Sequence, residues 1–243
     1  MIRSVDVAVV PALIGARPPA AAAVVIDVLR ATSTIAVALA NGATSIIPVR
    51  EPGDAIAVRN RIGRDRVLLC GERNSRLIAG FDRDNSPASY PAEVVAGKTL
   101  ALTTTNGTRA LLEAARDGAS VYCGALLNRR AVARALLAGH TGDVLLVCAG
   151  NEGTLSLEDL LCAGAIVAAL GRDGAAIEPS DAARAAMSLF EGHAKRLTTA
   201  IASSTHARAL RDAGFAADVA ACAELDVLDV VPVYREGIVT ALR

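Results

Sequence analysis

The sequence contains no tryptophan, and aromatic residues make up only 2% of its 243 residues. Hydrophobic residues nevertheless account for 53% of the chain, so we expect a large core built from Ala, Val, Leu and Ile. Lysine is also scarce. Only Lys98 and Lys195 are present, which limits any lysine-dependent chemistry to two candidate residues.

The chain carries no excess of charge. Lys and Arg together number 25, as do Asp and Glu, which argues against a nucleic acid or an anionic membrane as a partner held by bulk charge. No uncharged apolar run approaches the roughly 18 residues that a membrane span needs. The five cysteines form no CxxC pair, which favours a reduced, cytoplasmic setting and offers no zinc site.

Short runs of Val, Leu and Ile alternate with Ala- and Leu-rich helical stretches. This alternation predicts an α/β fold of three layers, in which helices flank a mostly parallel sheet. Residues 1–243 are expected to form a single unit, and a division into two α/β lobes is the alternative. Strands are expected near residues 5–10, 22–27, 44–49, 66–70, 98–102, 119–123, 143–148 and 228–234. Helices are expected near residues 33–41, 53–62, 107–116, 128–138, 156–170, 180–191 and 193–212. Residues 74–97 are predicted to form a long loop, and residues 172–227 a mainly helical cap or second lobe.

Five of the expected strands are followed at once by polar residues. These polar clusters lie at residues 27–34, 71–74, 103–108, 124–128 and 148–159. In a parallel sheet the clusters would share one edge, formed by the carboxyl ends of the strands, where open α/β sheets bind their ligands. A single cluster is explained equally well as a helix cap or a turn, but five at one edge favour a binding site.

Two of the clusters suit an anionic ligand. Residues 103–108 place hydroxyl groups and Gly107 just before a helix, where free backbone amides bind phosphate. Asp27 and Arg30 precede another helix. Arg30 would bind a phosphate or carboxylate through two parallel donors, while Asp27 binds a metal ion or acts as a base. The alternative is a charged helix end with a surface arginine.

The remaining carboxylates are not equally good candidates for metal ligands. Ser156, followed three residues later by Asp159, resembles a capping box, which gives Asp159 a structural explanation. Glu158 has no such explanation and is the better candidate for a metal ligand. Glu72, next to Arg73, is a further candidate, although the pair is also typical of a simple turn.

Several familiar signatures are missing. Neither GxxxxGK[ST] nor GxGxxG occurs, so the usual nucleotide-binding loops are absent. Cys70 and Arg76 have the C-x5-R spacing of cysteine-dependent phosphatases, but a chain so rich in arginine produces that spacing by chance. Three histidines show no mutual spacing and are expected at the surface: His140, His193 and His206.

Five sequence blocks together resemble the 2-phosphosulfolactate phosphatase (ComB) family. In chain order they are Asp27-Val-Leu-Arg-Ala-Thr-Ser-Thr, Gly71-Glu-Arg, Gly80-Phe-Asp with Asn85-Ser-Pro, Thr103-Thr-Thr-Asn-Gly-Thr, and Cys148-Ala-Gly-Asn with Leu157-Glu-Asp. They span residues 24–164, and no block matches after about residue 172. The resemblance implies an α/β enzyme, a magnesium-dependent phosphatase acting on phosphorylated 2-hydroxy acids. The reaction it implies converts (2R)-2-phospho-3-sulfolactate into 3-sulfolactate and phosphate, a step towards coenzyme M.

The motifs and the local chemistry together define an expected site for a small anionic, phosphorylated substrate. The catalytic candidates are Asp27 and Arg30. The substrate-binding candidates are Arg73, Thr105, Asn106, Gly107, Thr108 and Asn128. The candidate ligands of Mg2+ are Asp27 and Glu158, with Glu72 and Asp159 as alternates. Two other functions remain open, a cysteine-dependent phosphatase that uses Cys70 and a non-catalytic anion-binding protein. A homodimer is also left open.

Overall fold

Strand β2 (Ala22–Ile26) lies between two hydrophobic cores in the computed structural model, which describes residues 1–17, 19–116, 119–172 and 177–242. Val24 and Ile26 pack into a core shared with helices α5 (Arg129–Gly139) and α6 (Leu157–Arg172). Ala23 and Val25 pack into a second core, shared with α1 (Ala31–Ala40) and α4 (Gly107–Ala114). Because successive strand residues point to opposite faces, helices cover both faces of the sheet. The predicted three-layer α/β fold is confirmed.

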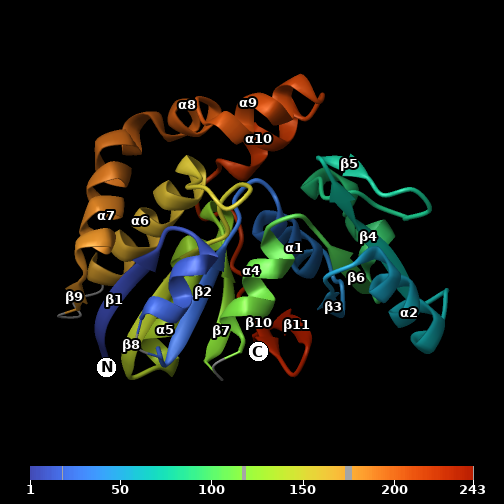
Figure 1. The fold of residues 1–243 in the computed structure, drawn as a ribbon, viewed down its shortest axis with the longest axis horizontal. Coiled ribbons are helices and arrows are strands. Elements are labelled where there is room, and N and C mark those ends of the chain that lie inside the picture. The colour runs from blue at the N-terminus through green and yellow to red at the C-terminus, as the bar shows by residue number, and fades with distance from the viewer. Residues whose placement is uncertain (18, 117–118, 173–176, 243) are drawn as a thin grey trace.

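The described strands form one sheet made of two parallel groups. Its order is β5 (Arg76–Leu77), β4 (Val67–Arg73), β6 (Thr99–Thr103), β3 (Ser45–Pro48), β11 (Ile238–Ala241), β10 (Pro232–Arg235), β7 (Ser120–Gly124), β2, β8 (Gly142–Cys148), β1 (Ile2–Ala8) and β9 (Glu178–Pro179). Strands β4, β6 and β3 are parallel to one another, and so are β7, β2, β8, β1 and β9. The antiparallel hairpin β10–β11 lies between the two groups (Figure 1).

This hairpin replaces the single strand that was predicted at residues 228–234. The turn between β10 and β11 is formed by Glu236 and Gly237, whose φ angles are 49° and 86°. Two consecutive positive φ values are typical of the tight turns that join antiparallel strands. In the hairpin, Val233 pairs with Tyr122 of β7, and Val239 pairs with Ile46 of β3.

The segment 74–97 is more ordered than a long loop. It contains strand β5, the 3-10 helix η2 (Pro87–Ser89) and the short helix α3 (Ala92–Val95). Tyr90 is fully buried and donates a hydrogen bond from its hydroxyl group to the carbonyl of Asp84. Asn41, directly after α1, donates to the carbonyl of Tyr90 at 2.9 Å, which fixes the segment against the helix layer.

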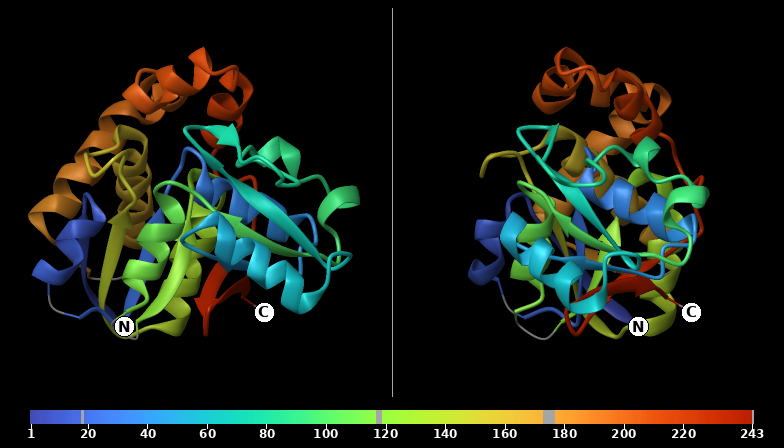
Figure 2. Two further views of the ribbon diagram at one scale, coloured as in Figure 1. Left: turned by 45° about the vertical axis from the view of Figure 1, so that its right-hand side comes forward. Right: turned by 90° about the vertical axis from the view of Figure 1, so that its right-hand side faces the viewer.

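The C-terminal helices are α7 (Asp181–His193), α8 (Leu197–Ala202), α9 (Thr205–Asp212) and α10 (Ala216–Cys222). Helix α7 packs alongside α6 and β1 at the side of the sheet. The helices that follow it cross the carboxyl ends of the strands, and both views of Figure 2 show them above the strands. A single helix over 193–212 was wrong, because α8 ends at Ala202 and Ser204 begins α9 by accepting a hydrogen bond from the amide of Ala207 at 3.1 Å.

The other helical elements complete the layers. They are α2 (Pro52–Ile62) and the 3-10 helices η1 (Pro11–Ala16), η3 (Leu126–Asn128) and η4 (Ala194–Arg196). Ala55 and Val58 of α2 cover a third, smaller core over β4 and β6. Within the described ranges, no helix combines the length and the apolar character that crossing a membrane requires.

Candidate active site

Four of the five polar clusters line one cavity of about 290 Å³. The loops after β2, β4, β6 and β8 contribute to it, and helix α9 covers it. Its polar and charged lining residues are Asp27, Arg30, Glu72, Asn74, Ser75, Asn85, Thr104, Thr105, Asn106, Asn151, Glu152 and His206. The predicted convergence of the clusters thus holds for all except the one at residues 124–128.

Asp27 lies at the centre of this site, immediately after the buried strand β2. Its backbone N–H and carbonyl both bond to the hydroxyl of Thr32, at 3.0 and 2.9 Å, and its Oδ1 accepts from the amide of Ala31 at 3.1 Å. No described residue donates a hydrogen bond to Oδ2. Burial raises the pKa of Asp27 to about 6; the charge of His206 opposes this rise, and the nearby carboxylates add to it.

Gly107 allows helix α4 to approach this carboxylate. A Cβ atom at residue 107 would lie only 2.6 Å from Oδ2 of Asp27 and 2.4 Å from the Cβ of Ala31. Gly107 was expected to take part in binding the substrate. In the structure the side chains of Asp27 and Ala31 take the space beside it, so Gly107 shapes the site through packing.

Glu158 and His206 form a second charged group beside the cavity. Glu158, in the first turn of α6, is 1% exposed, and neither carboxylate oxygen has a well-aligned hydrogen-bond donor among the described residues. Nδ1 of His206 lies 3.3 Å from its Oε1. Burial opposes ionisation of both groups, but their mutual contact lowers the pKa of Glu158 and, with the charge of Asp27, raises that of His206. His206 was expected at the surface, and that expectation was wrong.

Asp159 plays a structural part instead of presenting free oxygens. Its Oδ1 accepts from the amide of Val28 at 2.8 Å, and its Oδ2 accepts from the amide of Gly150 at 3.1 Å. The carboxylate therefore ties the loop after β2 to the loop after β8. Burial raises its pKa well above the ordinary range, and the charges of Asp27 and Glu158 add to that rise. The structure gives little support to Asp159 as an alternate metal ligand.

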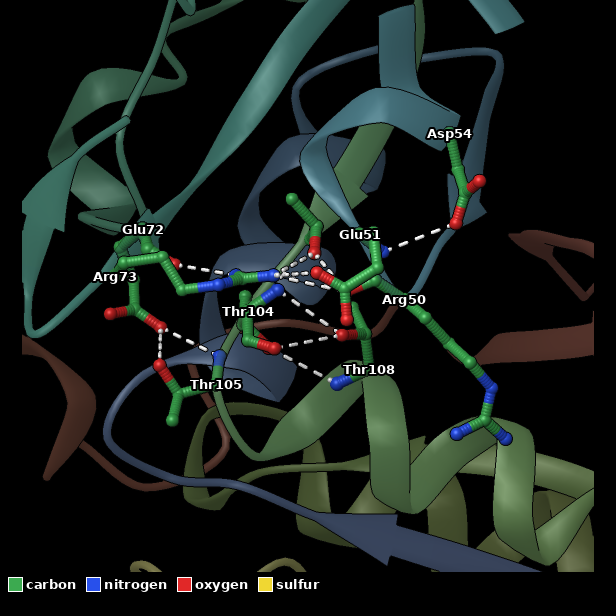
Figure 3. A network of polar contacts seen from close by, with 9 residues as sticks. Arg50, Glu51, Asp54, Glu72, Arg73, Thr104, Thr105 and Thr108 are labelled. Atoms are coloured by element: carbon green, nitrogen blue, oxygen red, sulfur yellow. Dashed lines mark hydrogen bonds and ion pairs between the residues drawn. The ribbon is translucent and has the colours of Figure 1, made fainter. Parts of the chain in front are cut away.

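Glu72 lines the cavity but is fully engaged by the surrounding loops. Its Oε1 accepts from the amide and the hydroxyl of Thr105, at 2.8 and 2.9 Å, and its Oε2 accepts from the amide of Ser75 at 2.8 Å. Thr104 and Thr108 bond reciprocally, each hydroxyl accepting from the other residue's amide at 3.1 Å (Figure 3). Thr105 thus lies in the cavity as expected, whereas Thr108 is a buried residue that stabilises the loop.

Arg73 lies on the other side of β4 from the cavity. It donates to the carbonyl of Arg50 and the hydroxyl of Thr103, each at 3.0 Å, and lies 3.8 Å from a carboxylate oxygen of Glu51 (Figure 3). Strand β4 extends through residue 73, so the adjacent side chains of Glu72 and Arg73 point in opposite directions. The expected substrate contact from Arg73 is therefore not supported.

Asn128 is also placed away from the cavity. It is fully buried, and its Oδ1 accepts from the amide of Ala125 at 2.9 Å. Its Nδ2 donates to the carbonyls of Cys123 and Val230, at 3.3 and 3.0 Å. These bonds occupy both ends of the side-chain amide, so the structure explains Asn128 as an anchor for the start of α5 and not as a substrate contact.

Arg30 lines the cavity, and the C-terminal helices hold it there. Its Nη1 lies 2.7 Å from Oδ2 of Asp218 in α10, and its guanidinium carbon is 4.1 Å from the ring centre of Phe215. Asp218 also accepts from the hydroxyl of Ser86 at 2.7 Å. Asp218 and Phe215 lie beyond the last recognisable sequence block, so no motif pointed to either residue.

Asn85 is a cavity residue to which the sequence analysis gave no role. Its backbone carbonyl accepts from the hydroxyl of Thr34 at 2.7 Å, which fixes its position. Its buried Oδ1 has no partner among the described residues, and the only other such atoms there are the two carboxylate oxygens of Glu158. Buried polar groups are rarely left unpaired without a functional reason. Asn85 falls within a block quoted for the family resemblance, and that was the available signal.

The free carboxylate oxygens are better suited to Mg2+ than to a metal ion whose ligands are all protein side chains. Across the described ranges, no three His, Cys, Asp or Glu side chains come together as a metal-binding group. Mg2+ commonly uses one or two carboxylates and completes its shell with water and phosphate oxygens. Oδ2 of Asp27 and the carboxylate of Glu158, whose oxygens accept no hydrogen bond from the described residues and whose Oε1 is paired only with His206, match that requirement.

The thiol of Cys70 is unsuited to act as a nucleophile. The residue is fully buried, and its Sγ donates to the carbonyl of Leu68 at 3.6 Å. Burial raises the pKa of Cys70 to about 12, so almost no reactive thiolate forms at neutral pH. Arg76, its partner in the C-x5-R spacing, is exposed on β5. The structure therefore argues against a cysteine-dependent mechanism.

Comparisons with known proteins agree with the family resemblance. The model of the 2-phosphosulpholactate phosphatase family matches residues 9–237. A probable 2-phosphosulfolactate phosphatase from Caldanaerobacter subterraneus subsp. tengcongensis is 44% identical over 216 residues, which cover 89% of this chain and 88% of the relative. Proteins with the same description from Symbiobacterium thermophilum and a Synechococcus species are each 43% identical, over 222 and 237 residues. Those alignments cover 91% and 96% of this chain, and 94% and 95% of the relatives.

Proposed function

The chain belongs to the 2-phosphosulpholactate phosphatase family, and from this premise we propose that it hydrolyses (2R)-2-phospho-3-sulfolactate to 3-sulfolactate and phosphate with Mg2+ as cofactor. The family is one of phosphoric monoester hydrolases. The observation that carries the proposal is the pair of buried carboxylates, Asp27 and Glu158, that keep unpaired oxygens beside a polar cavity.

Different residues of the chain bind the metal ion and orient the substrate. Asp27 and Glu158 would hold the cation, which when bound offsets charge on the phosphoryl oxygens and activates a water molecule. Arg30 presents its remaining N–H groups to the phosphate while Asp218 fixes its orientation. Asn106, at the start of α4, supplies a further amide donor.

The free oxygen of Asp27 also supports a covalent route. In that route Oδ2 attacks phosphorus, the sulfolactate oxygen leaves and takes up a proton, and water then hydrolyses the aspartyl-phosphate. Acid quenching during turnover of 32P-labelled substrate separates the two routes. A label retained on the wild-type protein but not on Asp27→Asn supports the covalent route, whereas an unlabelled wild-type protein supports direct attack by water.

The cellular setting is part of the same proposal. All five cysteines are free and buried, which supports a reducing compartment such as the cytoplasm. A role on the route to coenzyme M is supported by the substrate that the relatives' descriptions name.

A phosphate-release screen tests the proposed reaction. The wild-type protein, supplied with Mg2+, is offered phosphorylated 2-hydroxy acids with and without a sulfonate group, and Asp27→Asn serves as the control. We expect fastest release from 2-phosphosulfolactate and none above background from the variant. Absence of release from every member of the panel would contradict the proposal and favour a non-catalytic anion-binding protein.

A further inference from the structure

A second cavity, of about 300 Å³, adjoins the candidate active site. Thr105 and Asn106 line both cavities, so the loop before α4 forms their common wall. Asn106 Oδ1 accepts from the amide of Glu152 at 3.4 Å, a single long hydrogen bond across that wall. The apolar part of the second cavity's lining is formed by Val10, Pro11, Ala12 and Ala149.

Arg109 of α4 provides the positive charge of this second cavity. Its side chain is exposed, and no carboxylate of the described residues lies within ion-pair distance of it. Glu113 lines the same cavity, but it is paired with Arg116 at 2.6 Å. The guanidinium of Arg109 therefore keeps its donors available for a ligand, unlike that of Arg30, which is committed to Asp218.

The first cavity has a shortage of positive charge for a substrate with several acidic groups. Asp27, Glu72 and Glu152 contribute carboxylates to its lining, against Arg30 and His206 as basic residues. A phosphate held there with Mg2+ offsets part of the imbalance. A second strongly acidic group in the same cavity would still face carboxylates at short range, and like charges repel most strongly where water is excluded.

We infer that the second cavity binds the sulfonate group of the substrate, which is on the carbon next to the phosphate-bearing carbon, with Arg109 as the residue that determines specificity for it. The inference rests on the proposed function and adds the subsite and the residue that recognise the sulfonate of that substrate. A planar guanidinium matches the oxygens of such a group through parallel N–H donors. The apolar wall accommodates the carbon that carries it.

The test compares two substrates and three proteins. Wild type, Arg109→Gln and Arg61→Gln are assayed with Mg2+ on 2-phosphosulfolactate and on 2-phospholactate, which has a methyl group in place of the sulfonate-bearing carbon. Arg61 is an exposed arginine of α2 and serves as the matched control. We expect Arg109→Gln to lower kcat/KM for the sulfonated substrate at least tenfold, mainly by raising KM, and to leave 2-phospholactate nearly unchanged. Arg61→Gln should leave both substrates unchanged.

The possible outcomes separate this inference from the proposed function. If wild type hydrolyses the sulfonated substrate but Arg109→Gln does so equally well, or loses both substrates equally, the role of Arg109 is overturned while the phosphatase proposal stands. If wild type releases phosphate from neither substrate, the proposed function fails and the inference fails with it. Partial recovery of the sulfonated substrate in Arg109→Lys would support a charge contact, because lysine restores the positive charge without the planar donors.

Discussion

Arg30 and Asp218 lie 188 residues apart in the chain, yet Nη1 of the arginine is 2.7 Å from Oδ2 of the aspartate. Both side chains are buried, with 2% and 6% of their surface exposed. The ion pair joins the loop after β2 to helix α10, so the C-terminal helices take part in positioning a residue of the candidate active site. Removing one partner of a buried pair leaves an uncompensated charge, so the loss of either side chain should destabilise the fold.

Arg30→Lys is expected to reduce kcat/KM by more than tenfold, or about 1.4 kcal/mol of transition-state stabilisation. An ammonium group is a point charge that cannot bond Asp218, stack on Phe215 and offer parallel donors to phosphate together. Steady-state kinetics with 2-phosphosulfolactate measure the loss, and a melting curve confirms that the variant is folded. Near-normal kinetics would place Arg30 outside the reaction.

Asp27→Asn is expected to abolish turnover and to stabilise the metal-free fold at neutral and alkaline pH. The pKa of Asp27 is raised from 3.8 to about 6, so the folded state binds an extra proton between those values. Stability of the metal-free wild type therefore falls as pH rises from about 4 to about 6, by a total of about 3 kcal/mol. Denaturant melts in EDTA should show the variant more stable at pH 8 and the difference disappearing near pH 4. A difference independent of pH would contradict this account, and wild-type activity would exclude both roles of Asp27.

Glu158→Gln and Asp159→Asn should separate metal binding from loop stability. Among the described residues, Oε2 of Glu158 has no hydrogen-bond partner and Oε1 is paired only with His206, so neutralisation should weaken Mn2+ binding, measured by calorimetry, with a loss of stability limited to that ion pair. Asp159 accepts amide bonds through both oxygens, and Asn replaces one acceptor with a donor, which should cost about 1–3 kcal/mol of stability. The assignment would be reversed if Asp159→Asn lost Mn2+ affinity as strongly as Glu158→Gln while keeping its stability.

Cys70→Ser is expected to retain most of the activity. The thiol is fully buried, and its pKa of about 12 keeps it protonated. A serine hydroxyl without a partner would cost about 1–3 kcal/mol of stability, so the assay must be run well below the Tm. A folded but inactive variant, together with rapid inactivation of the wild type by iodoacetamide that phosphate prevents, would restore the thiol mechanism.

Local sequence patterns were enough to predict much of the fold and part of the candidate site. The all-apolar run of β2 is typical of a strand buried on both faces, and the structure places it between two cores. Asp27, Arg30, Glu72, Thr105 and Asn106 follow strands directly and meet in one cavity, as the topology of an α/β sheet predicts. These residues could be found because their position depends on strand ends, which the sequence marks clearly.

The wrong predictions concern features that depend on the direction of a side chain or on contacts between residues far apart in the sequence. Glu72 and Arg73 looked equivalent in sequence, but β4 continues through both, so only one of them can face the cavity. Asn128 follows a strand as the cavity residues do, yet its amide group donates to the carbonyl of Val230, just before β10. His206 reaches Glu158 only because α9 crosses the sheet edge, a long-range arrangement that no local pattern encodes.

The most direct test of the account is the metal dependence of phosphate release. The protein is stripped with EDTA, dialysed free of chelator and assayed with 2-phosphosulfolactate, first without metal and then with increasing Mg2+. We predict no release above background from the stripped protein and saturable recovery by Mg2+, with Glu158→Gln needing a much higher concentration. Full activity after exhaustive chelation, or equal Mg2+ dependence in wild type and Glu158→Gln, would contradict the claim that Asp27 and Glu158 form a magnesium site.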